Sequence, residues 1–318
     1  MSTSNDNKLE LRVQSISYAA KDTYLLELCA VDGRRLPEVT PGAHIDLHLP
    51  NGLIRSYSLV RADEQSFCYV VGIKKDAVSR GGSRYVHEQL RVGDLLTVSG
   101  PRNHFPLNLS AQHSVLIAGG IGITPIWCMS QFLEKVGASW ELWYSVRSRA
   151  DVAFLKELEA LGPKVNLHVD DEAGRVMDMQ AIISAASPEA HFYCCGPGPM
   201  LDAYERVTSE RKPESVHMER FAAKESIALD GGFVVALARS GKEVAIPEGS
   251  SILDVLLEEG VAIEYSCQEG ICGCWEVAVL EGEVDHRDAI LSDRERAQNK
   301  SMMVCCSGAK SQRLVLDI

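Results

Sequence analysis

Cysteines are the most conspicuous residues in this chain that could do chemistry. The sequence has 318 residues and ten cysteines, and half of these cysteines lie beyond residue 266. The C-terminal group consists of Cys267, Cys272, Cys274, Cys305 and Cys306. So many thiols in a short stretch are more typical of a metal site than of inert buried side chains.

The spacing within this group indicates which metal centre it would hold. Cys267 and Cys272 are separated by four residues, as in the C-x4-C-x2-C…C pattern of plant-type [2Fe–2S] ferredoxins. The next cysteine of that pattern is expected at Trp275, whereas Cys274 comes one position early. Zinc is an alternative, but this is not an ordinary zinc spacing. We therefore predict a [2Fe–2S] cluster held by Cys267, Cys272, Cys274 and Cys305, with Cys306 as an alternative ligand that would need a second rearrangement.

The other cysteines are scattered along the chain. They are Cys29, Cys68, Cys128, Cys194 and Cys195. The first dozen residues contain no apolar run of the kind found in a secretory signal, so a cytoplasmic protein without structural disulfides is expected. We expect these five to be small core residues.

Two segments in the first third of the chain suit a phosphorylated aromatic cofactor. In Arg55-Ser56-Tyr57-Ser58, an arginine can pair with phosphate oxygens and a tyrosine can lie against a ring. In residues 79–83, Gly81 and Gly82 let the backbone approach a ligand just before a predicted helix. A packed strand and a plain loop are the alternatives.

Two glycine-containing segments suit a nucleotide. Residues 118–125, with Gly119, Gly120 and Thr124, follow a short apolar strand and open a predicted helix. Backbone N–H groups at such a turn can hold a pyrophosphate, although the segment is not a GxGxxG fingerprint. Cys195, Gly196 and Pro197 follow a later strand, and ligands bind at the carboxyl ends of parallel strands. A tight structural turn is the alternative for each segment.

Charge and composition exclude several classes of protein. The net charge of −12 argues against nucleic-acid binding, which needs clustered basic residues. Residues 230–318 contain 8 basic and 16 acidic residues, so this segment carries a net charge of −8. Glycines and Pro125 interrupt the uncharged stretch at 103–133, so no membrane span is expected.

The spacing of apolar residues predicts three domains: an antiparallel β-barrel, an α/β parallel sheet and an α+β ferredoxin-like domain. Residues 1–109 alternate with period two between turn signals, with one short helix around Tyr85–Leu90. Residues 110–221 alternate predicted strands and helices, which indicates parallel strands with crossover helices. A linker at 222–232 precedes the ferredoxin-like domain at 233–318.

The individual elements of the later domains are predicted from local patterns. In the parallel sheet, strands are expected over Val115–Ala118, Glu141–Val146, Val165–Val169 and His191–Cys195, and helices over Pro125–Val136, Val152–Leu161, Met179–Ala186 and Met200–Arg211. In the last domain, Phe233–Ala238 and Glu243–Ile246 form a predicted hairpin, Ser251–Glu259 a helix and Glu276–Leu280 a strand.

Taken in order, these segments resemble the phthalate dioxygenase reductase family, the reductases of Rieske non-haem iron oxygenases. The resemblance covers nearly the whole chain. It rests on Arg55-x-Tyr57-Ser58, Ser79-Arg80-Gly81-Gly82-Ser83, Asn103-x-Phe105-Pro106-Leu107, Gly119–Pro125, Cys195-Gly196-Pro197, Glu219-Arg220-Phe221 and the C-terminal cysteines. It departs from the family at Trp275 and at Gly308, where the family tends to have arginine.

The resemblance implies an electron-transfer reductase that takes electrons from NADH and passes them through FMN and a [2Fe–2S] cluster to a Rieske oxygenase or demethylase. The implied FMN positions are Arg55, Ser56, Tyr57, Ser58, Lys74, Gly81, Gly82, Ser83 and Phe221. The implied NADH positions are Gly119, Gly120, Thr124, Arg147, Asp171, Cys195, Gly196 and Pro197. Asp171 favours NADH over NADPH, because an acid repels a 2′-phosphate. No catalytic acid or base is implied.

Two other functions remain open from the sequence. One is a flavin reductase or diaphorase with an impaired iron–sulfur centre, which would reduce a soluble acceptor. The other is a regulatory nucleotide-binding protein with a damaged redox centre. The visible absorption spectrum distinguishes these three functions.

Overall fold

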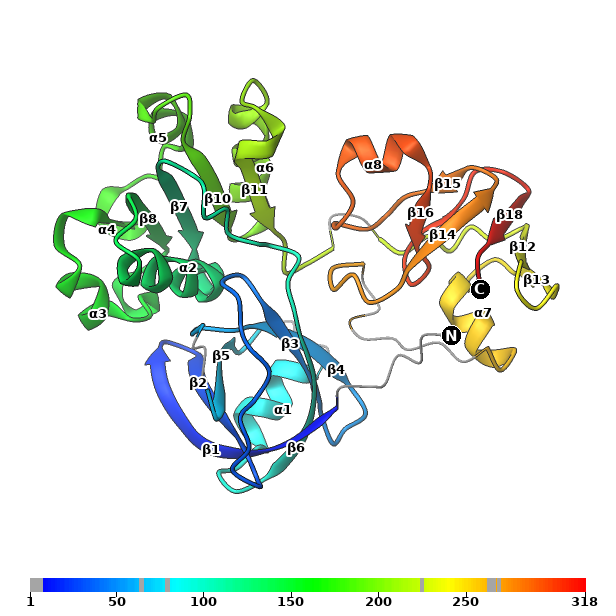
Figure 1. Ribbon diagram of the computed structural model, residues 1–318, viewed down its shortest axis with the longest axis horizontal. Helices are drawn as coiled ribbons and strands as arrows, with labels where there is room; N and C mark the ends of the chain where they lie inside the picture. Colours follow the sequence, from blue (N-terminus) through cyan, green and yellow to red (C-terminus); the bar gives the residue numbers. More distant parts are fainter. Residues whose placement is uncertain (1–7, 63–65, 78–80, 224–225, 262–266, 268–269) are drawn as a thin grey trace. The chain divides into compact units, whose positions relative to one another are not determined.

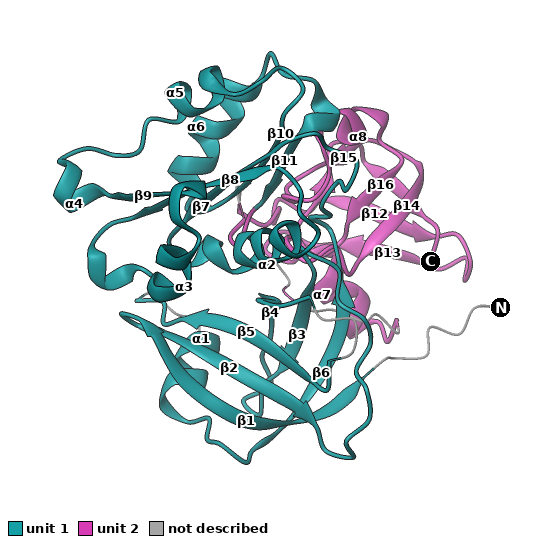
Figure 2. Cartoon of the chain, turned by 60° about the vertical axis from the view of Figure 1, so that its left-hand side comes forward, with its two compact units in different colours: residues 1–219 teal, residues 220–318 magenta. Residues whose placement is uncertain are grey.

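The structure, a computed structural model, describes residues 8–62, 66–77, 81–223, 226–261, 267 and 270–318. It has two compact units, residues 1–219 and 220–318 (Figure 2). None of the helices in the described ranges has the length and apolar character that crossing a bilayer requires.

Unit 1 begins with an antiparallel sheet that closes on itself as a barrel (Figure 1). Its elements are β1 (Leu9–Ala20), β2 (Thr23–Ala30), β3 (His44–His48), β4 (Ile54–Ser58), β5 (Cys68–Lys74), α1 (Gly82–Glu88) and β6 (Leu95–Arg102). The strands pair in the order β4-β3-β6-β1-β2-β5. Leu59 pairs with Val71, and the amide of Val60 donates to the carbonyl of Val70 at 2.9 Å, so the chain after β4 meets β5.

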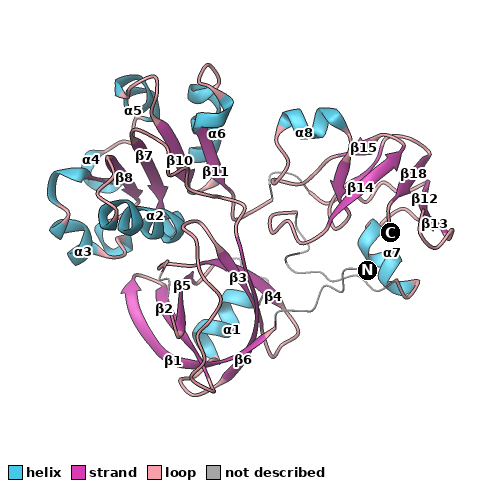
Figure 3. Ribbon diagram, viewed as in Figure 1, coloured by secondary structure: helices cyan, strands magenta, loops and turns pink. Residues whose placement is uncertain are grey.

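The second part of unit 1 is a parallel sheet with crossover helices (Figure 3). Its strands are β7 (Ser114–Gly119), β8 (Trp140–Val146), β9 (Val165–Val169), β10 (His191–Cys195) and β11 (Val216–Glu219). Its helices are α2 (Ile123–Lys135), α3 (Leu155–Ala160), α4 (Asp170–Ala173), α5 (Met179–Ala185) and α6 (Gly198–Thr208). The strand order is β11-β10-β7-β8-β9, so the direction of winding reverses between β7 and β10.

Both faces of this parallel sheet are covered by apolar side chains. Leu116 of β7 packs in one core cluster with Ile126 of α2. Its neighbour Val115 packs in another cluster with Ile182 of α5 and Leu201 of α6. Successive residues of a strand point to opposite faces, which explains why β7 is apolar throughout.

Unit 2 combines a mixed sheet with short helices. Its strands are β12 (Phe233–Leu237), β13 (Glu243–Ile246), β14 (Glu276–Glu281), β15 (Val284–Asp285), β16 (Ser301–Met303), β17 (Gly308–Ala309) and β18 (Arg313–Leu316). Its helices are α7 (Ile252–Glu258) and α8 (Asp293–Gln298). The main sheet has the order β13-β12-β18-β14-β16, and β15 pairs with β17. Ser251 caps α7 by accepting a hydrogen bond from the Asp254 amide at 3.1 Å.

Local patterns predict many of these elements well, and tertiary contacts change others. The predicted strands Val165–Val169, His191–Cys195 and Glu243–Ile246 match β9, β10 and β13. The helix expected over Val152–Leu161 begins only at Leu155, because Phe154 has a left-handed conformation with φ 60°. The helix expected around Tyr85–Leu90 begins earlier, at Gly82.

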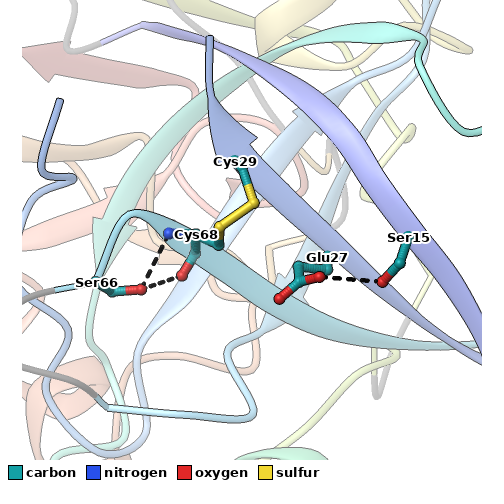
Figure 4. Close-up of a disulfide and its surroundings, with 5 residues drawn as sticks. All are labelled: Ser15, Glu27, Cys29, Ser66 and Cys68. Carbon is teal, nitrogen blue, oxygen red and sulfur yellow. Dashed lines mark hydrogen bonds between the residues drawn. A yellow bond between two sulfur atoms is a disulfide. The ribbon is translucent and has the colours of Figure 1, made fainter. Parts of the chain in front are cut away.

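The expectation that all scattered cysteines are reduced core residues is wrong for two of them. Cys29 of β2 and Cys68 of β5 form a disulfide (Figure 4). The two residues are 39 positions apart in the sequence, but the antiparallel register places them directly opposite each other. The pairing therefore depends on sheet register, which the scattered positions do not reveal. The remaining cysteines of this set, Cys128, Cys194 and Cys195, are buried as expected.

Candidate functional site

The two segments predicted to bind a flavin meet in unit 1. A Cβ atom added at Gly82 would lie 2.7 Å from Cγ of Arg55, so the arginine side chain crosses the start of α1. Gly81 has φ 106°, a conformation that glycine adopts readily. The glycines thus let Arg55 approach this loop. Ser79 and Arg80 of the predicted loop lie outside the described residues.

The side chains near Arg55 have distinct partners. Tyr57 is partly buried, and burial raises its pKa to about 12, so the phenol remains protonated at neutral pH. Ser56 donates a hydrogen bond from Oγ to Oδ1 of Asp46 at 2.6 Å. Ser83 Oγ accepts a hydrogen bond from the amide of Asp76 at 3.1 Å. Since alternate residues of β4 point to opposite faces, Ser56 faces away from Arg55 and Tyr57.

The two predicted nucleotide loops pack against each other at the carboxyl ends of β7 and β10. A Cβ atom added at Gly122 would lie 2.2 Å from the carbonyl oxygen of Cys195. One added at Gly119 would lie 2.6 Å from Cδ of Pro197, and one at Gly196 would lie 3.2 Å from Cα of Gly119. The winding of the sheet reverses at these strands, and such a switch point is where open α/β sheets bind ligands.

The barrel and the parallel sheet meet at the same loops. A Cβ atom added at Gly72 of β5 would lie 2.6 Å from Cγ2 of Thr124, in the first turn of α2. Lys74, the last residue of β5, forms an ion pair with Asp151 at 3.4 Å. The loop that contains Gly120 is held from the sheet, because the hydroxyl of Tyr144 donates to the Gly120 carbonyl at 3.2 Å.

Arg147 and Asp171 lie side by side after β8 and β9. The amide of Asp171 donates to the carbonyl of Arg147 at 3.0 Å. Next to them, Nε and Nη2 of Arg149 each donate to a carboxylate oxygen of Glu172 at 2.7 Å. Among the described residues at this edge of the sheet, the guanidinium of Arg149 is therefore already paired in a two-bond fork with Glu172.

A carboxyl group joins the two halves of unit 1. Ser58, at the end of β4, donates a hydrogen bond to Oε2 of Glu219 at 3.3 Å. Glu219 ends β11 and stands beside Cys195 in the register of the parallel strands. Burial raises the pKa of Glu219 to about 8. Burial also raises the pKa of the Cys195 thiol, and the charge of the nearby Glu219 raises it further.

Glu219 lies in the candidate site, but the sequence motifs did not predict it as a site residue. It belongs to the Glu219-Arg220-Phe221 segment, but the predicted site residue there was Phe221. An acidic residue that ends a strand of a parallel sheet is the signal that would have identified it. Phe221 itself belongs to unit 2, and 38% of its surface is exposed.

In unit 2, the predicted metal-binding cysteines come together. Cys272 accepts hydrogen bonds from the thiols of Cys267 and Cys274, which lower its pKa. The hydrogen bond to Cys272, followed by burial, raises the pKa of Cys267. Cys305 makes a hydrogen bond with Cys306, and this bond and burial raise its pKa, with a further contribution from the charge of Cys272. Cys267 and Cys274 thus lie near Cys272, and Cys305 lies near Cys306; thiols are the donors that iron–sulfur clusters use.

Trp275 takes a different direction from these thiols. Its indole packs against the hydrophobic core of unit 2, and its Nε1 atom is buried without a hydrogen-bond partner among the described residues. Cys274, by contrast, is partly exposed and contacts Cys272. Trp275 therefore packs against the core, whereas Cys274 lies next to Cys272.

Comparison with known proteins assigns the chain to a family. Residues 235–310 match the 2Fe-2S iron-sulfur cluster binding domain, and residues 116–206 match the oxidoreductase NAD-binding domain. The chain is 51% identical over 310 residues to a phenoxybenzoate dioxygenase subunit beta from Ectopseudomonas oleovorans, covering 98% of this chain and 97% of that protein. It is 48% identical over 317 residues to a tetrachlorobenzoquinone reductase from Sphingobium chlorophenolicum, covering 98% of each chain.

Among solved structures, phthalate dioxygenase reductase matches over 98% of both chains, with a TM-score of 0.75 and 37% sequence identity. The chain belongs to the phthalate dioxygenase reductase family. It is accordingly an oxidoreductase with NAD-binding and [2Fe–2S]-binding domains. The family and the fold class that the sequence motifs suggested are thereby confirmed.

The structure gives a physical reason for one of the two departures from the phthalate dioxygenase reductase pattern. A Cβ atom at Gly308 would lie 2.8 Å from Cβ of Ala228, so the segment around Ala228 approaches closely where the family tends to have arginine. The amide of Ala228 also donates to the carbonyl of Cys306 at 2.8 Å. Glycine at 308 therefore accommodates this packing.

Proposed function

We propose that this protein is an NADH-dependent reductase that passes electrons through FMN and a [2Fe–2S] cluster to a Rieske non-haem iron oxygenase. The observation that carries the proposal is the junction of Ser58, Glu219 and Cys195, where a strand of the barrel meets the nucleotide edge of the sheet. Hydride transfer requires contact between the nicotinamide ring and the flavin ring, and a junction shared by the two proposed binding sites supports such contact. FMN, when bound, accepts a hydride and releases single electrons.

For FMN, the proposed binding residues surround the start of α1 and the end of β4. Arg55, which crosses Gly82, would bind the phosphate, together with the backbone of Gly81 and the Ser83 region. Tyr57 would lie against the flavin ring, and Ser58 would face its redox-active side. Ser56, whose hydroxyl is bonded to Asp46, would contribute through its backbone. Lys74 and Phe221 complete the proposed FMN set.

For NADH, the proposed residues lie at the sheet's switch point. Gly119, Gly120 and Thr124 would cradle the pyrophosphate, and Cys195, Gly196 and Pro197 would line the nicotinamide side. Arg147 and Asp171 would meet the adenosine end. The close approach of Gly122 to Cys195 supports this arrangement, because it keeps both loops at one crevice.

For the cluster, the proposed ligands are Cys267, Cys272, Cys274 and Cys305. Cys274 replaces the cysteine expected at Trp275, and two observations support it. Cys274 contacts Cys272, and the indole of Trp275 packs into the core. Bound thiolates would hold the two irons, and the protein's contribution is to present sulfur atoms from one tight loop and from Cys305.

The ligand assignment is tested with Cys274→Ser and with the double variant Cys274→Thr/Trp275→Cys. We expect Cys274→Ser to lose its iron and its reduced-state EPR signal, while the double variant keeps the cluster. Cys306→Ser is the matched control, since Cys306 contacts Cys305 without belonging to the proposed set. Full iron content in Cys274→Ser, or loss of iron in Cys306→Ser, would refute the assignment.

Resemblance to the tetrachlorobenzoquinone reductase supports a second candidate, direct reduction of a quinone by the flavin. A Cys272→Ser variant that lacks the cluster but retains flavin distinguishes the two functions. Electron delivery to an oxygenase should be lost there, whereas direct quinone reduction should continue at the wild-type rate. For either function we propose the cytoplasm as the working compartment, because NADH is available there.

A further inference from the structure

The disulfide of unit 1 joins residues whose contact is imposed by the barrel itself. Cys29 and Cys68 are register partners in the antiparallel pair β2–β5, with their Cα atoms 4.0 Å apart. The neighbouring pair is the hydrogen-bonded one, since the amide of Ala30 donates to the carbonyl of Phe67 at 3.1 Å. Side chains of a non-hydrogen-bonded pair are the closest across a ladder. The two sulfurs would therefore remain adjacent in the reduced protein.

Both cysteines are also partly exposed on the outer face of the barrel. Leu28 and Tyr69, the adjacent register pair, are 0% and 1% exposed and point into the core. Because strand residues alternate, Cys29 and Cys68 point to the outer face, and both are partly exposed. Figure 4 shows the sulfur–sulfur bond spanning the two strands.

We propose that Cys29 and Cys68 are a site of reversible oxidation, with hydrogen peroxide as the oxidant and a dithiol as the reductant. The thiolate of one cysteine attacks a peroxide oxygen; an S–O bond forms, the O–O bond breaks and the released hydroxide takes up a proton. The second thiolate displaces hydroxide from this sulfenic acid, forming the S–S bond. In sum, two thiols and one peroxide give one disulfide and two waters. In the reverse reaction, a thiolate of the dithiol attacks the Cys29–Cys68 bond, and its second thiolate then displaces the protein sulfur, so the dithiol becomes a disulfide and both cysteines return to thiols. This inference is independent of the proposed electron-transfer function.

The surroundings allow this exchange without unfolding of the strands. The β2–β5 register continues from Cys29 to Thr23, so the strands remain paired when the S–S bond opens. At the start of β5, the Cys68 amide donates to Ser66 Oγ at 3.1 Å, and Ser66 Oγ donates to the Cys68 carbonyl. These bonds hold the backbone of Cys68 in either redox state.

Glu27 lies next to the two sulfurs, where its charge is expected to slow the reaction of the reduced pair. Its carboxylate and the two sulfurs lie within 4.8 Å of one another, and Ser15 donates a hydrogen bond to Glu27 at 3.1 Å. A negative charge beside the thiols disfavours the thiolate, which is the reactive form. Glu27→Gln should therefore speed oxidation roughly fivefold at neutral pH, as expected for one charge about 5 Å away in a half-exposed site.

The test uses the full-length holoprotein. It is reduced with dithiothreitol, freed of reductant, exposed to stoichiometric hydrogen peroxide and alkylated, and its peptides are then mapped by mass spectrometry without further reduction. We expect the Cys29 and Cys68 peptides to become linked by peroxide and to be released by dithiothreitol in the folded protein. In Cys29→Ser, Cys68 should be alkylated both before and after peroxide treatment. Cys68→Ala is the reciprocal variant, in which Cys29 should behave in the same way. Cys128→Ser, which changes a buried cysteine, should retain the linkage.

Three results would overturn the proposal. The first is that both cysteines remain alkylated after peroxide treatment. The second is that the linkage resists dithiothreitol until the protein unfolds, which would make it a permanent crosslink. The third is an oxidation rate in Glu27→Gln equal to that of the wild type and of Glu10→Gln, a control at an exposed carboxylate on β1.

Discussion

Replacing Glu219 with glutamine should change how the stability of this protein depends on pH. Burial raises the pKa of Glu219 from 4.5 to about 8 in the folded protein. The folded state therefore binds the proton more tightly than the unfolded state does. The stability that comes from the protonated group is fully present below pH 4.5 and is lost as the pH rises to about 8. A difference of this size corresponds to about 5 kcal/mol in total.

About half of this stabilising free energy, ~2.5 kcal/mol, is lost as the pH rises from 6 to 9. Glutamine cannot ionise, so the variant lacks this loss, while its amide oxygen can still accept the hydrogen bond from Ser58. We expect the free energy of unfolding of Glu219→Gln to exceed that of the wild type increasingly as the pH rises. Partial solvent access to Glu219 makes ~2.5 kcal/mol an upper bound for the change over this interval.

The assay is urea unfolding of the holoprotein followed by tryptophan fluorescence, at several pH values from 6 to 9. Trp127, Trp140 and Trp143 lie in unit 1 and report on the unit that contains Glu219. Glu189→Gln is the control, since Glu189 is an exposed carboxylate paired with Lys212. If the wild type and Glu219→Gln give parallel curves, Glu219 is already ionised at neutral pH and the reasoning fails.

Three further predictions concern binding. Gly122→Ala should weaken NADH binding at least tenfold in a fluorescence titration, because its Cβ would lie 2.2 Å from the Cys195 carbonyl oxygen, whereas Gly198→Ala, with open space around it, should bind normally. The protein should use NADH far better than NADPH, as judged by kcat/KM with an artificial acceptor; equal values would show that Asp171 does not select the nucleotide. Electron transfer to the oxygenase should slow as ionic strength rises, because residues 230–318 carry a net charge of −8; a stopped-flow rate that ignores salt would reject electrostatic docking.

Elements with a strong local pattern could be predicted from the sequence. β9 alternates apolar and polar residues, β10 is largely apolar, and the predicted limits of both strands match those in the structure. Ser250 or Ser251 signals the start of α7, because a serine side chain can accept the hydrogen bond of an otherwise unpaired amide, and Ser251 takes this position in the structure. The sulfur-rich C-terminal segment likewise indicates its chemistry through residue type and spacing alone. In each case, the information lies within a few neighbouring residues.

Other features depend on residues that are distant in the sequence. Spacing leaves open which residue near position 275 is the ligand, and the packing of the Trp275 indole against the core of unit 2 supports our proposal that it is Cys274. The raised pKa of Glu219 comes from its burial, and this burial depends on strands that are distant in the sequence, with Ser58 of β4 and Cys195 of β10 beside the carboxyl group. The pairing of Cys29 with Cys68 depends on a register in which a shift of one residue would turn the two side chains to opposite faces. Sequence determined the kinds of elements and the chemistry of the donors, because both are local properties. Tertiary structure decided which groups meet, because contact, burial and charge depend on the whole fold.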